Sequence, residues 1–327
     1  MRFPFATSGV PLVRRVRAAA VDFVSKPASP RPLACFRIGL AAVLLVQAFA
    51  LAPSVLELYG NGGLVQWRVA DRAVPAGVPR LTWVSAVLGP YGVGEADCVR
   101  VVFWTYVASL GFLLLGWRTR FAAAGAWLAH LTLSESGNAA IYGVDQFARI
   151  SLFYCAWIPV GTAVSVDRLA GRENGAPSAL ARLALRVLQI HLCIVYFSSG
   201  IEKASGTQWW DGEAIWRALM QPDMARFDFA WLASAPWLAK LACWGTLAVE
   251  LGYAFLIWPG RTRMMMGWAT VGMHLGIGVF MGLASFAGVM IVLNLGAFLV
   301  PAEPKPEDVK ADGITPVVAE SELAGVS

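Results

Sequence analysis

The few side chains that could carry chemistry in this sequence lie inside or at the ends of strongly apolar segments. Lys203 ends one such segment, Glu250 lies near the middle of another, and His274 lies within a third. Ionisable groups surrounded by hydrocarbon are costly, and they usually face a helix-bundle interior or an aqueous cavity. A buried carboxylate must also find a partner or keep its proton. We therefore predict that Glu250 and His274 face a shared interior cavity rather than lipid.

The other two histidines, His130 and His191, also lie in apolar segments. Each has two interpretations of equal weight: a functional contact in the bundle interior, or a hydrogen bond to a neighbouring helix. On a helix, His191, Ser198 and Glu202 share one stripe, and Lys203 is turned about 100° from Glu202. The simplest role for Lys203 is that of a cation at the end of a span, reaching lipid headgroups.

The composition indicates the solvent that surrounds these groups. Of the 327 residues, 57% are hydrophobic and 14% are charged, whereas a soluble globular chain is about a quarter charged. Crossing a bilayer core of about 30 Å takes roughly 20 apolar residues on a helix. We predict an all-α integral membrane protein with a bundle of about eight transmembrane helices, in apolar blocks at residues 34–52, 98–116, 121–133, 147–163, 179–201, 238–258, 264–282 and 285–300.

The positive charges predict the orientation of this bundle. With the N-terminus in the cytoplasm, the inside segments hold sixteen Lys and Arg residues and the outside segments hold six, as the positive-inside rule requires. We predict a basic cytoplasmic segment over residues 1–33, a transmembrane domain over 34–300 and a disordered cytoplasmic tail over 301–327. The protein is then a multi-pass protein of the inner (plasma) membrane with both termini in the cytoplasm.

Two outside loops are long enough to form structure of their own. Residues 53–97 are rich in glycine and proline and predict an irregular cap over the helix ends. Residues 202–237 hold five tryptophans, which are typical of the membrane interface, and predict short interfacial helices. Between spans, Gly272 and Gly276, like Gly278 and Gly282, have the spacing that allows two helices to approach closely.

Several function classes find no support in the sequence. The basic residues lie between apolar blocks rather than on a soluble face with interleaved aromatic residues, so we expect membrane lipids and no nucleic acid as partners. The five cysteines fit neither a CxxC pair nor a zinc site, and we expect no metal centre. Most of these cysteines should be small buried apolar residues.

One run of residues resembles a known family. From Tyr196 to Ala214 the chain reads YFSSGIEKASGTQWWDGEA, which resembles the signature of the HTTM domain, the transmembrane region shared by vitamin K-dependent gamma-glutamyl carboxylases and many bacterial proteins. Three further pieces agree in family order, over about residues 33–300: FRIGLAAVLLVQ with LYGNGGLV, then GNAAIYGVDQFARISLFYCAWIPVG, then MHLGIGVFMGLASFAGVMI.

The resemblance implies a quinone or hydroquinone ligand. In carboxylases the lysine at the position of Lys203 is taken to be the base that deprotonates reduced vitamin K. By analogy Lys203 is the base here, and His274 and Glu250 complete the catalytic site. A base needs a neutral amine, and the adjacent Glu202 favours the charged form unless the helix turns it away. Implied contacts to the quinol come from Asn138, His191, Tyr196 and Trp210.

The sequence also departs from the carboxylase pattern. Carboxylases carry a histidine directly after the asparagine before the fourth span, whereas Ala139 follows Asn138 here. They also carry a large lumenal domain after the spans, whereas we expect only a short tail after residue 300. The resemblance therefore implies a quinol-type ligand without implying glutamate carboxylation.

Three functions are compatible with these residues. The first is a quinone-dependent oxidoreductase or modifying enzyme, carboxylase-like or epoxidase-like, with a small thiol-redox protein as partner. The alternative is a non-catalytic membrane component of a peptide toxin export, immunity or similar envelope system, with a peptide partner. A transporter is the third, and only the buried ionisable groups favour it.

The orientation can be tested at Ser205, in the second outside loop. A single cysteine at this position, in a cysteine-free background, should react with a membrane-impermeant maleimide in intact cells, because the Lys and Arg excess lies on the other side of the membrane. A cysteine at Arg120, in an inside segment, is the control. Labelling at position 205 only after the membrane is opened would reverse the topology.

Overall fold

The computed structural model describes residues 12–137, 141–222 and 226–303, and the predicted tail therefore lies almost wholly outside the described residues. Within these ranges the chain is helical and forms no strand. Its one β-bridge, between Ala28 and Ser178, is isolated. The prediction of an all-α protein is confirmed.

Each of the eight predicted apolar blocks coincides with a helix. Three of these helices are long and apolar enough to cross a membrane: α2 with its continuation to Tyr59, α6 and α10. The last block forms a shorter apolar helix, and a membrane crossing by the remaining helices stays a prediction. The eight are α2 (Arg31–Leu51), α6 (Glu95–Leu115), α7 (Thr119–Ser136), α8 (Gly143–Trp157), α10 (Ala179–Ala204), α13 (Pro236–Leu256), α14 (Gly260–Phe280) and α15 (Ala284–Asn294).

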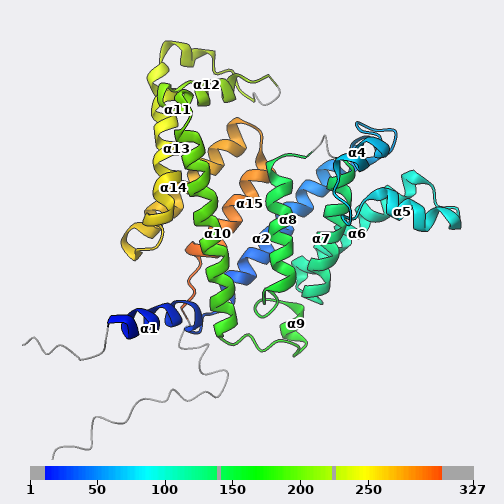
Figure 1. The fold of residues 1–327 in the computed structure, drawn as a ribbon, viewed down its shortest axis with the longest axis horizontal. Coiled ribbons are helices and arrows are strands. Elements are labelled where there is room, and N and C mark those ends of the chain that lie inside the picture. The colour runs from blue at the N-terminus through cyan, green and yellow to red at the C-terminus, as the bar shows by residue number, and fades with distance from the viewer. Residues whose placement is uncertain (1–11, 138–140, 223–225, 304–327) are drawn as a thin grey trace, which may run out of the picture.

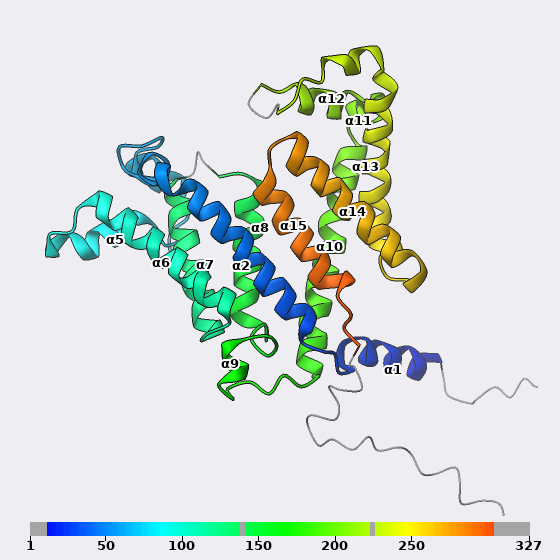
Figure 2. The same cartoon turned by 180° about the vertical axis from the view of Figure 1, so that it is seen from behind.

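Helix α2 lies obliquely through the middle of the bundle (Figures 1 and 2), between the group α6, α7 and α8 and the group α10, α13 and α14. It packs against α6, α15 and the π-helical turn η5 (Leu295–Leu299). Glycines make its contact with the last helix close, because a Cβ on Gly39 would lie 2.7 Å from a methyl group of Val292. Likewise a Cβ on Gly296 would lie 2.8 Å from the Cβ of Phe36.

Both long loops fold into short helices at the same end of the bundle (Figure 1). Residues 53–97 contain α3 (Val55–Tyr59), α4 (Trp67–Ala73) and α5 (Leu81–Leu88), with 3-10 turns at Ala52–Ser54 and Gly89–Tyr91. This cap is more regular than predicted, because its glycines and prolines bound the short helices rather than interrupt them. Residues 202–237 contain α11 (Thr207–Asp211), α12 (Glu213–Met220) and η4 (Ala230–Ser234), as expected.

A buried carboxylate organises the opposite end of the bundle. Asp167, in α9 (Val166–Leu169), accepts hydrogen bonds from the backbone N–H groups of Arg118 and Thr119, both at 2.9 Å, and from the Thr119 hydroxyl at 2.8 Å. Arg172 forms an ion pair with it at 2.9 Å. Burial alone would raise the pKa of Asp167, but these hydrogen bonds outweigh it and lower the pKa to about 2. The carboxylate thus fixes the start of α7.

Replacing Asp167 with Asn should therefore destabilise the protein in a pH-dependent way. Because the pKa of the folded state is depressed, the stabilisation by Asp167 is present above about pH 4 and is lost as the pH falls towards 2; from the size of the shift it is about 2 kcal/mol. Thermal unfolding of the purified protein at pH 7 and at pH 3 measures the effect. Asp22→Asn, on an exposed helix, is the control, and equal losses in both variants at pH 7 would contradict the role.

Candidate functional site

The predicted lysine and glutamate meet in space. The Nζ of Lys203, on α10, lies 3.0 Å from the Oε2 of Glu250, on α13, and it donates a hydrogen bond to the Ser199 hydroxyl. The Glu250 side chain is 8% exposed and that of Lys203 is 25% exposed. In the described part of the chain Glu250 Oε2 has no well-aligned hydrogen-bond donor, so the contact is an ion pair. A partly accessible amine thus faces a buried carboxylate.

Aromatic side chains cover the amine. Lys203 Nζ lies 5.4 Å from the centre of the Trp209 ring, within the range of a cation–π contact. Trp210, which the sequence suggested as a ligand contact, is half exposed and donates its indole N–H to the Ala204 carbonyl oxygen. Glu202 is exposed, whereas Glu250 is buried beside the amine. The acidic neighbour of Lys203 in space is therefore Glu250.

A glycine allows this ion pair to form. A Cβ on Gly200 would lie 2.9 Å from a methyl group of Leu251 and 3.1 Å from the Leu251 backbone nitrogen. Helices α10 and α13 can therefore approach closely beside Glu250, one turn before Lys203. Residues 196, 200 and 203 share one helical face, which explains the spacing of the tyrosine, glycine and lysine in YFSSGIEK.

A chain of polar groups connects four helices next to this pair. The Tyr196 hydroxyl lies 2.8 Å from His274 Nε2 and accepts a hydrogen bond from Asn294 at 2.7 Å. The Asn294 carbonyl oxygen accepts from the Tyr253 hydroxyl at 2.7 Å. All four side chains are buried, and they come from α10, α14, α15 and α13. Glu250 and His274 thus both face the interior.

This network assigns the tautomer of His274. Because Asn294 donates to the Tyr196 oxygen, the hydroxyl proton is free to point to His274 Nε2, which leaves the ring proton on Nδ1. His274 Nδ1 is buried and has no hydrogen-bond partner among the described residues. Buried polar atoms are rarely left unpaired, so this N–H is available to a ligand or to water.

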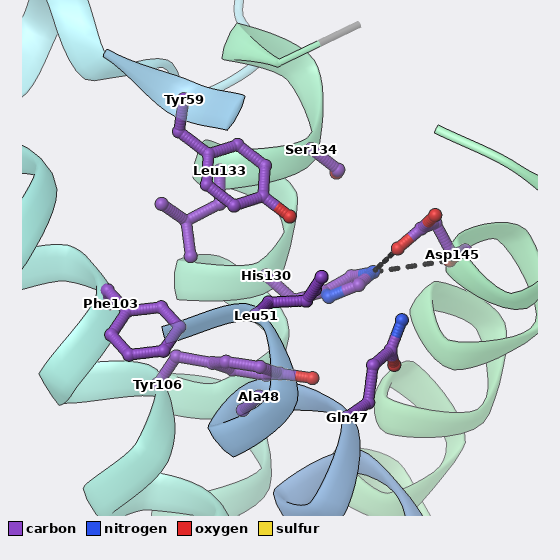
Figure 3. Close-up of a pocket in the computed structure, with 10 residues that line it drawn as sticks. All are labelled: Gln47, Ala48, Leu51, Tyr59, Phe103, Tyr106, His130, Leu133, Ser134 and Asp145. Carbon is purple, nitrogen blue, oxygen red and sulfur yellow. Dashed lines mark hydrogen bonds and ion pairs between the residues drawn. The ribbon is translucent and has the colours of Figure 1, made fainter. Parts of the chain in front are cut away.

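A second polar cluster surrounds a cavity of about 20 Å3 between α2, α6, α7 and α8 (Figure 3). The cavity has room for about one water molecule. The Nε2 of His130 lies 3.2 Å from the Asp145 carbonyl oxygen and 4.0 Å from its carboxylate, so His130 binds a neighbouring helix. Gln47, Tyr59, Tyr106 and Ser134 complete its polar lining.

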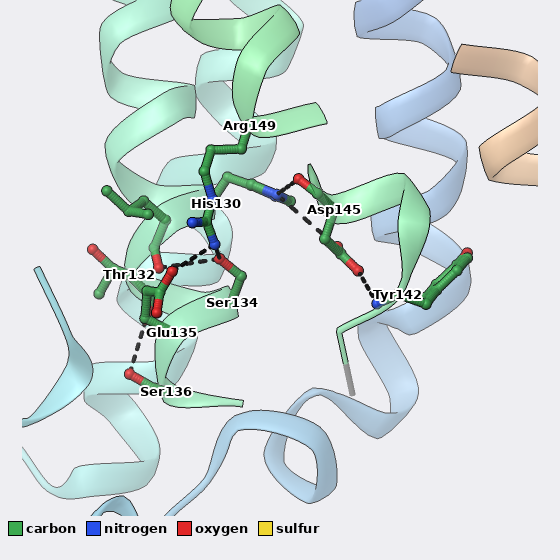
Figure 4. A network of polar contacts seen from close by, with 9 residues as sticks. His130, Thr132, Ser134, Glu135, Ser136, Tyr142, Asp145 and Arg149 are labelled. Atoms are coloured by element: carbon green, nitrogen blue, oxygen red, sulfur yellow. Dashed lines mark hydrogen bonds and ion pairs between the residues drawn. The ribbon is translucent and has the colours of Figure 1, made fainter. Parts of the chain in front are cut away.

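A network of ion pairs and a helix cap includes His130, Ser134 and Asp145 from the cavity lining (Figure 4). Arg149 on α8 and Glu135 on α7 pair at 2.5 Å, and both side chains are mostly buried. The Asp145 carboxylate accepts from the Tyr142 backbone N–H at 3.0 Å and so caps the start of α8. These contacts join α7 to α8 and leave little room for a ligand larger than water.

His191, another predicted site residue, lies apart from the Lys203 cluster. His191 Nδ1 lies 2.9 Å from the Tyr154 hydroxyl on α8, so its partner is another helix. Asn138 lies outside the described residues. The interpretation of Gly272 as a point of close helix approach is wrong, since nothing lies within 4 Å of a Cβ there. Gly267 and Gly278 do make close contacts, with Leu299 and Ala287.

Sequence reasoning missed several members of both clusters. Asn294 is an amide in the last apolar block, and Arg149 is a charged residue in the fourth. A polar group within an apolar block is unusual, and this could have identified both residues from the sequence. Tyr253 and Ser199 carried no signal, because hydroxyl groups are common in spans. Trp209, which makes the aromatic contact to the lysine, was not among the predicted site residues.

Comparison with known proteins identifies the family. A model of the HTTM domain matches residues 26–299, most of the chain. The chain belongs to the HTTM domain family. It is also 26% identical over 196 residues to the uncharacterized protein YitO of Bacillus subtilis (strain 168), covering 57% of this chain and 63% of YitO, less than two thirds of that protein. No solved structure matches.

Membership of the HTTM family, together with the apolar helices, identifies the bundle as a membrane domain. The matched region begins before α2 and ends at η5, so it contains both polar clusters. The Lys203 signature, which first indicated the family, lies within it.

The role of Gly200 can be tested by adding a side chain. Gly200→Leu should lower the free energy of unfolding by about 1–3 kcal/mol, because α10 and α13 must move apart, and that movement should also separate Lys203 from Glu250. Gly245→Leu is the matched control. Gly245 lies on the partner helix α13, and no described atom lies within 4 Å of a Cβ built on it. Thermal unfolding in detergent measures both, and equal shifts would contradict the close approach.

Proposed function

We propose that this HTTM protein is a membrane enzyme in which Lys203 removes a proton from a quinol-class substrate. The observation that carries the proposal is the amine of Lys203, partly accessible and held 3.0 Å from the buried carboxylate of Glu250. Ionisable pairs in membrane domains are costly and usually mark sites of proton movement. The family resemblance of the lysine motif supplies the class of ligand.

The polar and aromatic groups of the site fit a quinol. A bound quinol supplies two hydroxyl groups and two reducing electrons. The Lys203 nitrogen can accept a proton from a quinol hydroxyl. The unpaired N–H at His274 Nδ1 can donate to a quinol oxygen, and the Trp209 ring can pack against the flat aromatic ring. The Tyr196 hydroxyl keeps His274 in the tautomer that presents this N–H.

The pair of Lys203 and Glu250 can provide a neutral amine without help from a third charged group. In the proposed step Lys203 and Glu250 hold one proton between them, and the amine is neutral when this proton is on the carboxylate. In a low dielectric the neutral form, amine with carboxylic acid, needs less solvation than two ions. The amine then takes a hydroxyl proton: one N–H bond forms as one O–H bond breaks. The pair gains one positive charge, which stabilises the negative charge left on the substrate oxygen.

The tryptophans of α11 limit the access of water to the amine. Trp210 donates to Ala204 at the end of α10, and Trp244 on α13 donates to the Trp210 carbonyl oxygen at 3.1 Å. These bonds hold α11 across the ends of α10 and α13, on the side where Lys203 is exposed. Excluding water strengthens the electrostatic contacts within the site.

The decisive variant is Lys203→Arg. Arginine keeps the charge but does not accept a proton at accessible pH, and its planar fork does not fit a site shaped for an amine. We expect Lys203→Arg and Lys203→Ala to lose the function by about 100-fold or more, as loss of a general base does. The matched control is Lys240→Arg, because Lys240 also lies over a tryptophan, Trp244, at 5.2 Å.

The readout is the phenotype that deletion of the gene produces, scored at equal protein abundance, with Glu250→Gln and Glu202→Gln in parallel. Extraction of the purified protein and mass spectrometry should detect an isoprenoid quinone in the wild type. Lys203→Arg with a wild-type phenotype would refute the base and favour a non-catalytic membrane component of an export or immunity system. Absence of any quinone from the extract would refute the ligand class.

A further inference from the structure

Helix α1 (Leu12–Ser25) lies outside the bundle and has two different faces. On a helical projection, Val13, Val16, Ala20, Phe23 and Val24 share one side. The valines of this stripe are strongly exposed, Val13 at 77% and Val16 at 60%. An apolar stripe this exposed needs a partner that is not part of the described chain.

The other side of α1 is basic. Arg14 lies directly opposite Phe23 on the projection, and Arg17 lies on the flank of the apolar stripe. Arg15 and Asp22 lie beside each other on the side opposite the stripe, so the helix carries a net positive charge. A short helix with an apolar stripe and arginines around it is typical of segments that lie in a membrane interface.

The last turn of α1 is attached firmly to the bundle. The Arg186 guanidinium lies 3.9 Å from the centre of the Phe23 ring and its Nε donates to the Phe23 carbonyl oxygen at 2.9 Å. The Phe23 ring also lies 5.6 Å from that of Trp258, at the end of α13. Both views show α1 extending sideways from the end of the bundle where α2 and α10 begin, across the direction of α10 (Figures 1 and 2).

These contacts set the direction in which the apolar stripe faces. Phe23 turns towards Arg186 and Trp258, which are parts of the bundle, and Val16 lies on the same side of α1 two turns away. The stripe therefore lies on the side of α1 that faces the bundle, next to the apolar outer face of α10. Leu180 and Leu183 on that face are 53% and 46% exposed. Lipid that surrounds α10 would meet the stripe of α1 at its surface.

We propose that α1 lies on the membrane surface, with its valine stripe among the acyl chains and with Arg14 and Arg17 bound to anionic phospholipid headgroups. Arg14, on the side away from the acyl chains, and Arg17, on the flank of the stripe, meet phosphate groups at the headgroup level, and Lys26 adds charge at the C-terminal end. This surface is separate from the Lys203 site, and it does not depend on the function proposed there.

Fluorescence in proteoliposomes tests the insertion of the stripe. Single cysteines at Val16 and at Ala18, on opposite sides of α1, carry an environment-sensitive dye in the full-length, otherwise cysteine-free protein. In vesicles of phosphatidylcholine and phosphatidylglycerol with spin-labelled acyl chains, the dye at position 16 should be quenched at least about twofold more than the dye at position 18. Equal quenching at both positions would overturn the proposal, as would self-quenching at position 16 between copies, which would identify a second copy as the cover.

Charge reversal tests the headgroup contact. With the dye at position 16, Arg14→Glu together with Arg17→Glu should lower the surface-bound fraction of α1. Each basic residue near an anionic surface raises the membrane binding constant roughly fivefold. High salt should have the same effect, and vesicles of phosphatidylcholine alone should show little dependence on the arginines. Arg68→Glu, on α4 at the other end of the bundle, is the matched control. Equal quenching in neutral and anionic vesicles would overturn the lipid assignment.

Discussion

A charge in a membrane domain must be paired, and the ion pair of Lys203 and Glu250 is the constraint on which the candidate site depends. Removing either partner leaves the other as an uncompensated charge, which costs several kcal/mol. The pair forms because Gly200 lets α10 and α13 approach. Once the two helices are fixed at that level, Tyr196, two turns deeper on α10, is held where it contacts His274.

The bundle keeps its two polar clusters apart. Phe286 on α15 lies 5.7 Å from the His274 ring and 5.8 Å from the Phe147 ring, centre to centre. Phe147 belongs to α8, the helix that begins at the Asp145 cap. In the described part of the chain an aromatic contact therefore connects the two sides, and apolar rings conduct no protons. The cluster around His130 acts as structural support for α7 and α8, and the proton chemistry that we propose belongs to the Lys203 side.

The helices could be predicted from the sequence because an apolar block long enough to span a bilayer has few other ways to satisfy its backbone. Lys203, Glu250 and His274 could be singled out because charge is rare at that depth. The residues that contact these three side chains could not be predicted. Which tyrosine meets His274 depends on helix rotation and contact distance, which one sequence does not contain. The same limit explains why the glycine at position 272 was misassigned, since spacing specifies a face without specifying a neighbour.

The π-helical turn after Asn294 has a consequence for chain length. A π turn holds one more residue than an α turn and is equivalent to a one-residue insertion. Asn294 precedes it and contacts two tyrosines, while the Ala297 carbonyl oxygen within it accepts a bond of 2.6 Å from Gln189. Adding a further residue to η5 would turn the segments on either side by about 100° relative to each other, whereas removing its extra residue would return the segment to a regular α-helix with the same faces. An insertion could not keep both sets of partners, so this segment tolerates a deletion better than an insertion.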